Sequence, residues 1–204
     1  KIYSDNDIMI IINQIIDELK PNFTNQDLRK CISNIKNEVA LNLESIEQEA
    51  QVLKCFKSYQ NALKERNAID LDDILYYFKL ALNDDLFKER LNFKYIMVDE
   101  CQDTNPVQYE IIKALRGKDN NVFMCGDDDQ SIYAFRGADP FLIKRYKDDF
   151  HPEEIILTKN YRNTKRILSS SLNLISNNNH RVIKNYSSVR KMDAVLEVIS
   201  CNSN

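Results

Sequence analysis

Three short apolar runs in the second half of this 204-residue chain are each followed by a cluster of polar residues. The runs occupy residues 95–98, 122–125 and 155–158. A short apolar run of this kind indicates a buried β-strand. Because ligands of an open parallel sheet bind beyond the carboxyl ends of its strands, the polar clusters are candidate sites.

Capped helices are predicted between and after these strands. Asn105–Pro106 begins a helix that runs to Gly117, since it offers an N-cap residue, a proline at the first helical position and a glycine past the end. Asp139–Pro140 begins a second helix, and Thr164 begins a third over about 165–177. Strands that alternate with helices predict a parallel sheet with crossovers, and therefore an α/β layer.

The first ninety residues instead carry apolar side chains at helical spacing. Those of the first helix recur every three or four positions: Ile8, Ile11, Ile12, Ile15, Ile16 and Leu19. Asp5 and Asp7 are candidates for its N-cap, and a proline ends it. Further helices are predicted over about 26–43 and 44–66, and another begins at Asp70. The apolar stripes are interpreted as the core of a helical bundle.

The composition argues against several classes of protein. The three glycines lie between Gly117 and Gly137 and none is part of a G-x-x-x-x-G-K-[ST] pattern, so the chain carries no phosphate-binding P-loop of its own. No apolar run approaches the length of about 18 residues that a membrane span needs. The first residues include no initiator Met and no signal-peptide core, which is typical of a piece of a longer protein.

The cysteines and histidines favour an intracellular protein without a structural metal site. The five cysteines have no C-x-x-C spacing, and His151 and His180 have no candidate ligands near them. Reduced thiols fit a reducing compartment, which is the nucleus in a eukaryote and the cytoplasm in a bacterium.

Charge is unevenly distributed along the chain, although the formal net charge is only -3. Positions 1–100 carry a net charge of -5, and positions 101–204 a net charge of +2. Residues 155–192 contain no acid but eight basic residues: Lys159, Arg162, Lys165, Arg166, Arg181, Lys184, Arg190 and Lys191. This run is either a solvated helix face with a tail or a surface that binds phosphates.

Two carboxylates follow the first predicted strand. Asp99 and Glu100 stand directly after the run 95–98. In a nucleotide hydrolase one such carboxylate holds Mg²⁺ through its water shell and the other orients and deprotonates the attacking water. Acidic loops after strands are common, so the pair alone leaves a structural interpretation open.

The clusters after the other two strands combine aromatic, amide and guanidinium groups. Gln130 is placed to sense a terminal phosphate, while Tyr133, Phe135 and Arg136 have the composition of a platform on which single-stranded bases stack. The alternative is that both aromatic rings belong to the core. The segment 160–162 adds a tyrosine that can stack on a base and an arginine that can bind a phosphate through two hydrogen bonds.

Taken together and in order, the three clusters are far more specific than each alone. VDECQDTN at 98–105, GDDDQSIYAFRGAD at 126–139 and NYRN at 160–163 resemble motifs II, III and IV of the superfamily 1 DNA helicases of the UvrD/Rep/PcrA type, and their spacing is similar too. The resemblance is strong over about 70–180 and continues more weakly upstream, at 2–5 and 69–73.

The resemblance implies a fold and its domains. The fold class is α/β: a helical subdomain resembling 1B over 1–69, then a partial RecA-like parallel sheet with flanking helices over 70–192, which resembles the second half of subdomain 1A. This is the P-loop NTPase type, with the P-loop absent from the chain. Residues 193–204 would begin the next strand or a linker, with a candidate strand over 195–200.

The resemblance also implies roles at the matching positions. Asp99 would hold Mg²⁺ and Glu100 would activate water, which makes them catalytic together with Gln130 and Arg162, the residues that would contact the γ-phosphate of ATP. Tyr161 would stack on the nucleotide base. The residues that would touch single-stranded DNA are Tyr133, Phe135 and Arg136. Position 135 is often Trp in the family, and Phe keeps a stacking face but loses area and the indole donor.

The function that follows is an ATP-dependent 3'–5' DNA helicase, which couples ATP hydrolysis to translocation on single-stranded DNA and unwinds 3'-tailed duplexes in DNA repair or replication. The chain alone would be catalytically incomplete, because an ATPase site of this type closes between two RecA-like lobes. Repair or replication proteins are candidate partners, and no membrane is expected. Two alternatives stay open: a subunit of a UvrD-like helicase–nuclease, and a non-catalytic module that binds DNA or protein.

Overall fold

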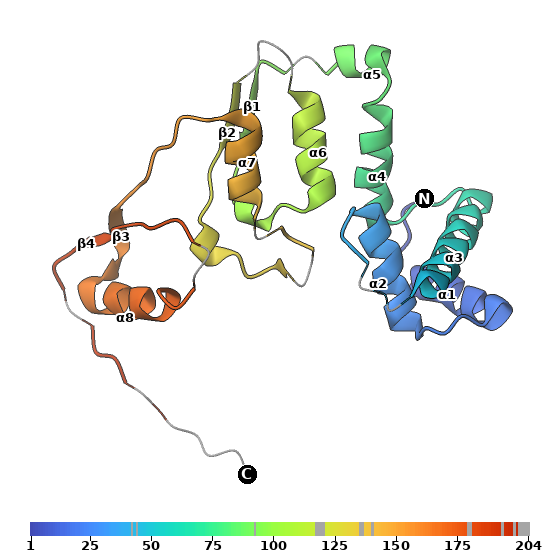
Figure 1. The fold of residues 1–204 in the computed structure, drawn as a ribbon, viewed down its shortest axis with the longest axis horizontal. Helices are drawn as coiled ribbons and strands as arrows, with labels where there is room; N and C mark the ends of the chain where they lie inside the picture. Colours follow the sequence, from blue (N-terminus) through green and yellow to red (C-terminus); the bar gives the residue numbers. More distant parts are fainter. Residues whose placement is uncertain are drawn as a thin grey trace. The chain divides into compact units, whose positions relative to one another are not determined.

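The computed structural model describes residues 1–41, 43, 45–91, 93–116, 121–134, 137–139, 141–178, 181–192, 194–197 and 199. The chain divides into two compact units (Figure 1). The first comprises Lys1–Asp127 and Ser131–Leu142, and the second comprises Asp128–Gln130 and Ile143–Asn204.

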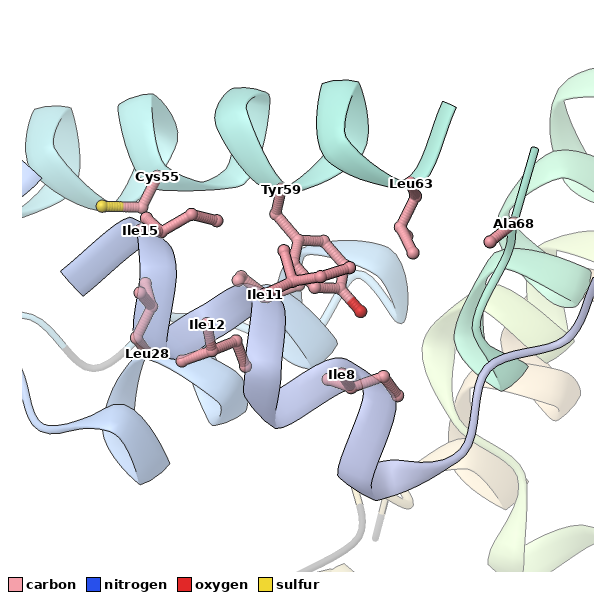
Figure 2. Close-up of a cluster of buried hydrophobic side chains, with 10 residues drawn as sticks. Ile8, Ile11, Ile12, Ile15, Leu28, Cys55, Tyr59, Leu63 and Ala68 are labelled. Carbon is pink, nitrogen blue, oxygen red and sulfur yellow. The ribbon is translucent and has the colours of Figure 1, made fainter. Parts of the chain in front are cut away.

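The first unit begins with three helices, α1 (Asp5–Leu19), α2 (Asn25–Lys36) and α3 (Ile46–Glu65). Their apolar stripes form one buried cluster, as the helical spacing predicts. Figure 2 shows side chains of all three helices directed toward one another, with the ring of Tyr59 between α1 and α3. The members of this core are Ile8, Ile11, Ile12, Ile15, Leu28, Ile32, Cys55, Tyr59, Leu63 and Ala68.

Helix boundaries differ from the prediction at two places. The N-cap of α1 is Ser4, whose hydroxyl accepts the backbone N–H of Asp7, so Asp5 is not the cap and Asp7 completes the capping box from within the helix. The helix predicted over about 26–43 ends at Lys36, because Glu38 adopts a left-handed backbone conformation that no helix can continue.

A buried group of charges connects α2 with the start of the next helix. Lys36 is fully buried, and its Nζ lies 2.6 Å from Oδ2 of Asp70 and 2.7 Å from Oδ1 of Asp73. The hydroxyl of Tyr59 donates to Asp70 at 2.8 Å. Burial and the nearby carboxylate of Asp70 raise the pKa of Tyr59 above its ordinary value, so the phenol stays protonated and keeps donating.

The beginning of the chain lies beside the beginning of α4 (Leu71–Ala81). Ile2 and Ile69 form a parallel β-bridge, with Tyr3 N–H donating to the Ile69 carbonyl and Ile69 N–H donating to that of Lys1. The two upstream segments to which the sequence resemblance extends, 2–5 and 69–73, are therefore neighbours in space. The domain boundaries proposed at 69 and 192 remain predictions.

The α/β part of the first unit continues with α5 (Asp85–Glu89), β1 (Tyr95–Val98), the short 3₁₀ turn η1 (Cys101–Asp103), α6 (Pro106–Leu115) and β2 (Asn121–Met124). Strands β1 and β2 pair in parallel, with α6 as the crossover and α4 packed beside it (Figure 1). The predicted Asn105 cap and the first two predicted strands are confirmed, but the strands are not buried as predicted, since Tyr95, Met97 and Phe123 are exposed.

The second unit contains the 3₁₀ turn η2 (Asp128–Gln130), most of α7 (Leu142–Phe150), β3 (Lys159–Thr164), α8 (Lys165–Ile175) and β4 (Ser187–Arg190). Strands β3 and β4 form a second parallel pair, and α8 packs against both. The predicted helix at 165–177 is confirmed, although Thr164 makes no side-chain capping bond.

The strand predicted at 155–158 is wrong. Residues 155–157 are exposed and belong to no strand, and the strand begins at Lys159, where pairing with Ser187 starts. An apolar run forms a β-strand only where a neighbouring strand supplies hydrogen-bond partners. The first residue of β4 pairs with Lys159, so the strand begins there. Of the candidate strand at 195–200, the described residues 195–197 and 199 are not in a strand.

Several predicted positions lie outside the described residues: Gly117, Phe135, Arg136, Pro140, Val198 and Ser200. The mixture of helices with short parallel strands agrees with the predicted fold class, a partial RecA-like layer preceded by helices. Among the described residues, no helix has the length and apolar character needed to cross a bilayer.

Candidate nucleotide and DNA site

The carboxyl ends of β1 and β2 lie at the same edge of the first unit. Val98 pairs with Met124, and the Cys125 N–H donates to the Val98 carbonyl at 2.8 Å. The ladder continues for one more step, because Cys101 N–H donates to the Cys125 carbonyl at 2.9 Å. The polar residues that follow the two strands are thereby brought together, as expected for parallel strands.

Asp99 and Glu100 are the first polar residues at this edge, and both are exposed. Oδ1 of Asp99 accepts the backbone N–H of Glu100 at 2.9 Å. Glu100 lies in the left-handed region, at φ 48° and ψ 44°, where a non-glycine residue is uncommon. This turn directs the chain into η1 immediately after the strand, so that two successive carboxylates stand at its end.

A pocket of about 470 Å³ lies beside these carboxylates, within the first unit. Its wall combines apolar residues of α4 and α6 with polar residues around η1: Leu75, Phe78, Val98, Asp99, Glu100, Asp103, Thr104, Gln108, Ile111 and Ile112. Oδ1 of Asp103 is buried in this wall and has no hydrogen-bond partner among the described residues. Carboxylate oxygens are the ligands of hard cations, so the donor set fits Mg²⁺.

Gln102 joins the two strand ends, and the sequence analysis assigned it no role. Its side chain is buried, its Nε2 donates to Oε2 of Glu100 at 2.8 Å, and its Oε1 accepts the backbone N–H of Asp127 at 3.0 Å. The neighbouring thiol of Cys101 is buried too, and burial raises the pKa of Cys101 to about 11, with Cys125 adding to the shift. The Cys101 thiol is therefore protonated at neutral pH.

The acidic turn η2 is engaged by basic residues of the second unit. Arg181 makes a two-pronged contact with Asp129, with Nε at 2.8 Å from Oδ1 and Nη2 at 2.5 Å from Oδ2. Lys184 pairs with both Asp128 and Asp129, and the Val182 N–H donates to Asp128 at 2.6 Å. The carboxylates of Asp128 and Asp129 are thereby neutralised by these ion pairs.

These ion pairs show what two of the eight basic residues at 155–192 contact. Arg181 and Lys184 face inward, whereas Lys165, Arg166, Arg190 and others are exposed. A pocket of about 510 Å³ in the second unit is lined by Lys165, Arg166, Ser169, Ser170, Arg190, Lys191 and Met192. The spacing of residues along the sequence gave no sign that two of the basic residues pair with η2, since their partners lie more than fifty positions earlier.

The structure describes some of the residues that were predicted to contact the γ-phosphate, the nucleotide base or DNA. Gln130 is exposed at the end of η2, and Tyr133 is 36% exposed, so its ring is not a core residue. Tyr161 and Arg162 lie within β3 rather than after a strand, and Tyr161 is 68% exposed. Asp99 and Glu100 belong to the first unit, whereas Gln130, Tyr161 and Arg162 belong to the second. Phe135 and Arg136 lie outside the described residues.

Comparison with known proteins identifies the family. Relatives include the ATP-dependent DNA helicase Rep of Buchnera aphidicola subsp. Baizongia pistaciae, 37% identical over 211 residues, and that of Escherichia coli (strain K12), 34% identical over 213 residues. Each alignment covers 99% of this chain, which spans 31% and 32% of the two relatives. The ATP-dependent DNA helicase PcrA of Staphylococcus epidermidis is 36% identical over 163 residues, which are 74% of this chain and 22% of that protein.

The chain thus spans about a third of the length of the Rep proteins it matches. The family described as UvrD/REP helicase N-terminal domain matches residues 1–151, which include the helices of the first unit, the carboxylates after β1 and the loop after β2. The chain belongs to the UvrD/REP helicase N-terminal domain family.

Proposed function

We propose that the protein carrying this chain is an ATP-dependent 3'–5' DNA helicase, which uses ATP hydrolysis to move along single-stranded DNA and to unwind 3'-tailed duplexes. The observation that carries the proposal is the pair of carboxylates, Asp99 and Glu100, at the carboxyl end of β1 in a member of this family. Its relatives are named ATP-dependent DNA helicases.

In this proposal the two carboxylates have different roles in ATP hydrolysis. Asp99 holds Mg²⁺, which when bound supplies positive charge against the phosphates of ATP. Glu100 accepts the proton of the attacking water, and the hydrogen bond from Gln102 fixes the direction of its carboxylate. The exposure of Asp99 and Glu100 supports both roles, since a buried pair could not reach a nucleotide and water.

Three further residues are assigned to the nucleotide in this proposal. Gln130 and Arg162 contact the γ-phosphate, and Tyr161 stacks on the base. The exposed ring of Tyr161 supports stacking, because it is free of a protein core. Asn160 accepts the backbone N–H groups of Arg162 and Asn163, at 3.0 and 2.7 Å, and so fixes the backbone from which the arginine projects.

Single-stranded DNA is the proposed polynucleotide substrate. Tyr133, Phe135 and Arg136 form its stacking platform, and the partial exposure of Tyr133 supports this role. The basic pocket beside α8, with four cationic side chains among its seven lining residues, supports contact with the phosphate backbone. We place the protein inside the cell, in DNA repair or replication, where the described cysteines remain free thiols.

Substitution of the general base tests the proposal. In the helicase that contains this chain, Glu100→Gln is expected to retain ATP binding and to abolish turnover, because the amide is nearly isosteric but cannot accept the proton of water. Glu110→Gln is the matched control, since Glu110 lies on α6 and pairs with the neighbouring Lys113 at 3.6 Å. Nucleotide binding and steady-state hydrolysis are measured for both variants. Hydrolysis by Glu100→Gln within about tenfold of wild type, less than a general base contributes, would remove Glu100 from this role.

A further inference from the structure

The side chain of Gln102 uses both ends of its amide. It donates to Oε2 of Glu100 at 2.8 Å and accepts the backbone N–H of Asp127 at 3.0 Å. The chemistry of the two partners fixes the orientation of the amide, because a carboxylate only accepts and a backbone N–H only donates. Gln102 is 4% exposed, so water does not compete freely for either bond. One rigid group therefore joins the candidate general base to the first residue of the loop after β2.

The packing around this amide leaves it little freedom. A Cβ on Gly126 would lie 2.6 Å from Oε1 of Gln102 and 2.6 Å from Sγ of Cys101, so the site requires glycine at the end of β2. The backbone of Gln102 is held within η1, and its carbonyl lies 3.5 Å from the hydroxyl of Ser131, on the far side of η2. Gln102 thus contacts two residues of the loop after β2, Asp127 and Ser131.

We propose that Gln102 is a positioning residue that makes the orientation of the Glu100 carboxylate depend on the conformation of the loop at 127–134. The loop carries Tyr133, so DNA bound to it shifts the Asp127 N–H, the amide follows, and the carboxylate turns with it. This regulation of the ATPase by DNA rests on the function proposed above. It assigns Gln102 no contact with nucleotide or DNA.

Two variants separate the two hydrogen bonds. Gln102→Met keeps the volume of the side chain and removes both bonds. Gln102→Glu keeps an acceptor for the Asp127 N–H but places a second carboxylate against Glu100, so it removes only the bond to Glu100. Gln51→Met is the matched control, because Gln51 lies on α3, outside the candidate site, and its Oε1 accepts the backbone N–H of Asn22 at 3.2 Å.

Hydrogen exchange in the 204-residue chain tests the bridge itself. In Gln102→Met the Asp127 amide is expected to exchange about tenfold faster, since it loses its acceptor. The same amide exchanges at the wild-type rate in Gln102→Glu and in Gln51→Met. An Asp127 amide whose exchange is unchanged in Gln102→Met would overturn the bridge, without reference to any enzymatic activity.

Kinetics in the helicase that contains this chain tests the coupling. We expect the ratio of ATP turnover with single-stranded DNA to turnover without it to fall toward unity in both Gln102 variants and to stay at the wild-type value in Gln51→Met. DNA affinity is retained in all three variants. Wild-type stimulation retained in the Gln102 variants would overturn this proposal and leave the proposed function standing. A wild-type protein with no DNA-stimulated hydrolysis would overturn both.

Discussion

At the scale of single residues, the candidate site depends on one unusual backbone conformation. Glu100 is a non-glycine residue at φ 48°, directly after β1, and the strain of such a conformation persists only where the surroundings determine it. Here the surroundings are the Asp99 carboxylate on its N–H and the Gln102 amide on its own carboxylate. The backbone and the side chain of the proposed base are therefore set by separate neighbours.

Stacking by Tyr133 is a prediction at this scale. Tyr133→Ala in the helicase is expected to weaken single-strand binding by about 1–3 kcal/mol, with little dependence on base sequence. Its thermal midpoint should change little, because the ring is 36% exposed. Tyr77→Ala on α4, 46% exposed, is the control for removing a partly exposed tyrosine. Titration with fluorescent oligonucleotides measures the affinity for DNA, and a melting curve measures the thermal midpoint. Unchanged affinity with a lowered midpoint would show that Tyr133 is structural.

At the scale of elements, helices are held together by charges as well as by apolar packing. Lys36 of α2 is paired with Asp70 and Asp73, which form the capping box of α4, while Tyr59 of α3 donates to Asp70. A buried cation with two carboxylates and a phenol fixes three helices at one point. Removing one partner leaves the others buried without compensation.

Lys36→Met is therefore expected to lower the free energy of unfolding by about 3–5 kcal/mol. Lys79→Met provides the comparison, since Lys79 pairs with Glu38 where both side chains are partly exposed, and its loss should cost less than about 1 kcal/mol. Urea unfolding of the 204-residue chain, followed by its helical circular dichroism, measures both. Equal losses in the two variants would show that the buried group contributes no more than a surface pair.

The ion pairs between η2 and the segment at 181–184 give a second prediction at the scale of elements. Arg181 and Asp129 form a two-pronged pair whose side chains are 15% and 11% exposed. A double-mutant cycle with Arg181→Met and Asp129→Asn is expected to give a coupling energy of about 1–3 kcal/mol. The same cycle for Lys147 and Glu154, which are more exposed, should give less than about 1 kcal/mol. A coupling near zero for the first pair would contradict the attachment.

At the scale of the whole molecule, the chain carries one part of the ATPase site proposed above. It has no P-loop sequence, so the phosphates of ATP would lack both a backbone cradle and its lysine. We expect no hydrolysis by the 204-residue chain, with or without single-stranded DNA, in an assay of phosphate release. Turnover above about 1 per second, the low end of ordinary kinase-type catalysis, would contradict this.

Much of this arrangement was predictable from the sequence, for physical reasons. The first two strands were recognised because each apolar run ends in polar residues, and α6 because Asn105 and Pro106 begin it. The strand predicted at 155–158 was wrong because the apolar content of a segment does not specify which residues pair with a neighbouring strand. The bonds made by Gln102 and Arg181 reach residues 25 and 52 positions away, so no local pattern could reveal them.

The bridge between Ile2 and Ile69 has a consequence for how such chains diversify. Helices α1 to α3 lie between the two segments of the bridge. They are also tied to the rest of the first unit by Lys36, which pairs with Asp70 and Asp73, and by Asn37, which accepts hydrogen bonds from the Asn105 side chain and the Val107 N–H. An exchange of residues 4–68 is therefore expected to keep the carboxylates after β1 in place only where Lys36 and Asn37 are retained.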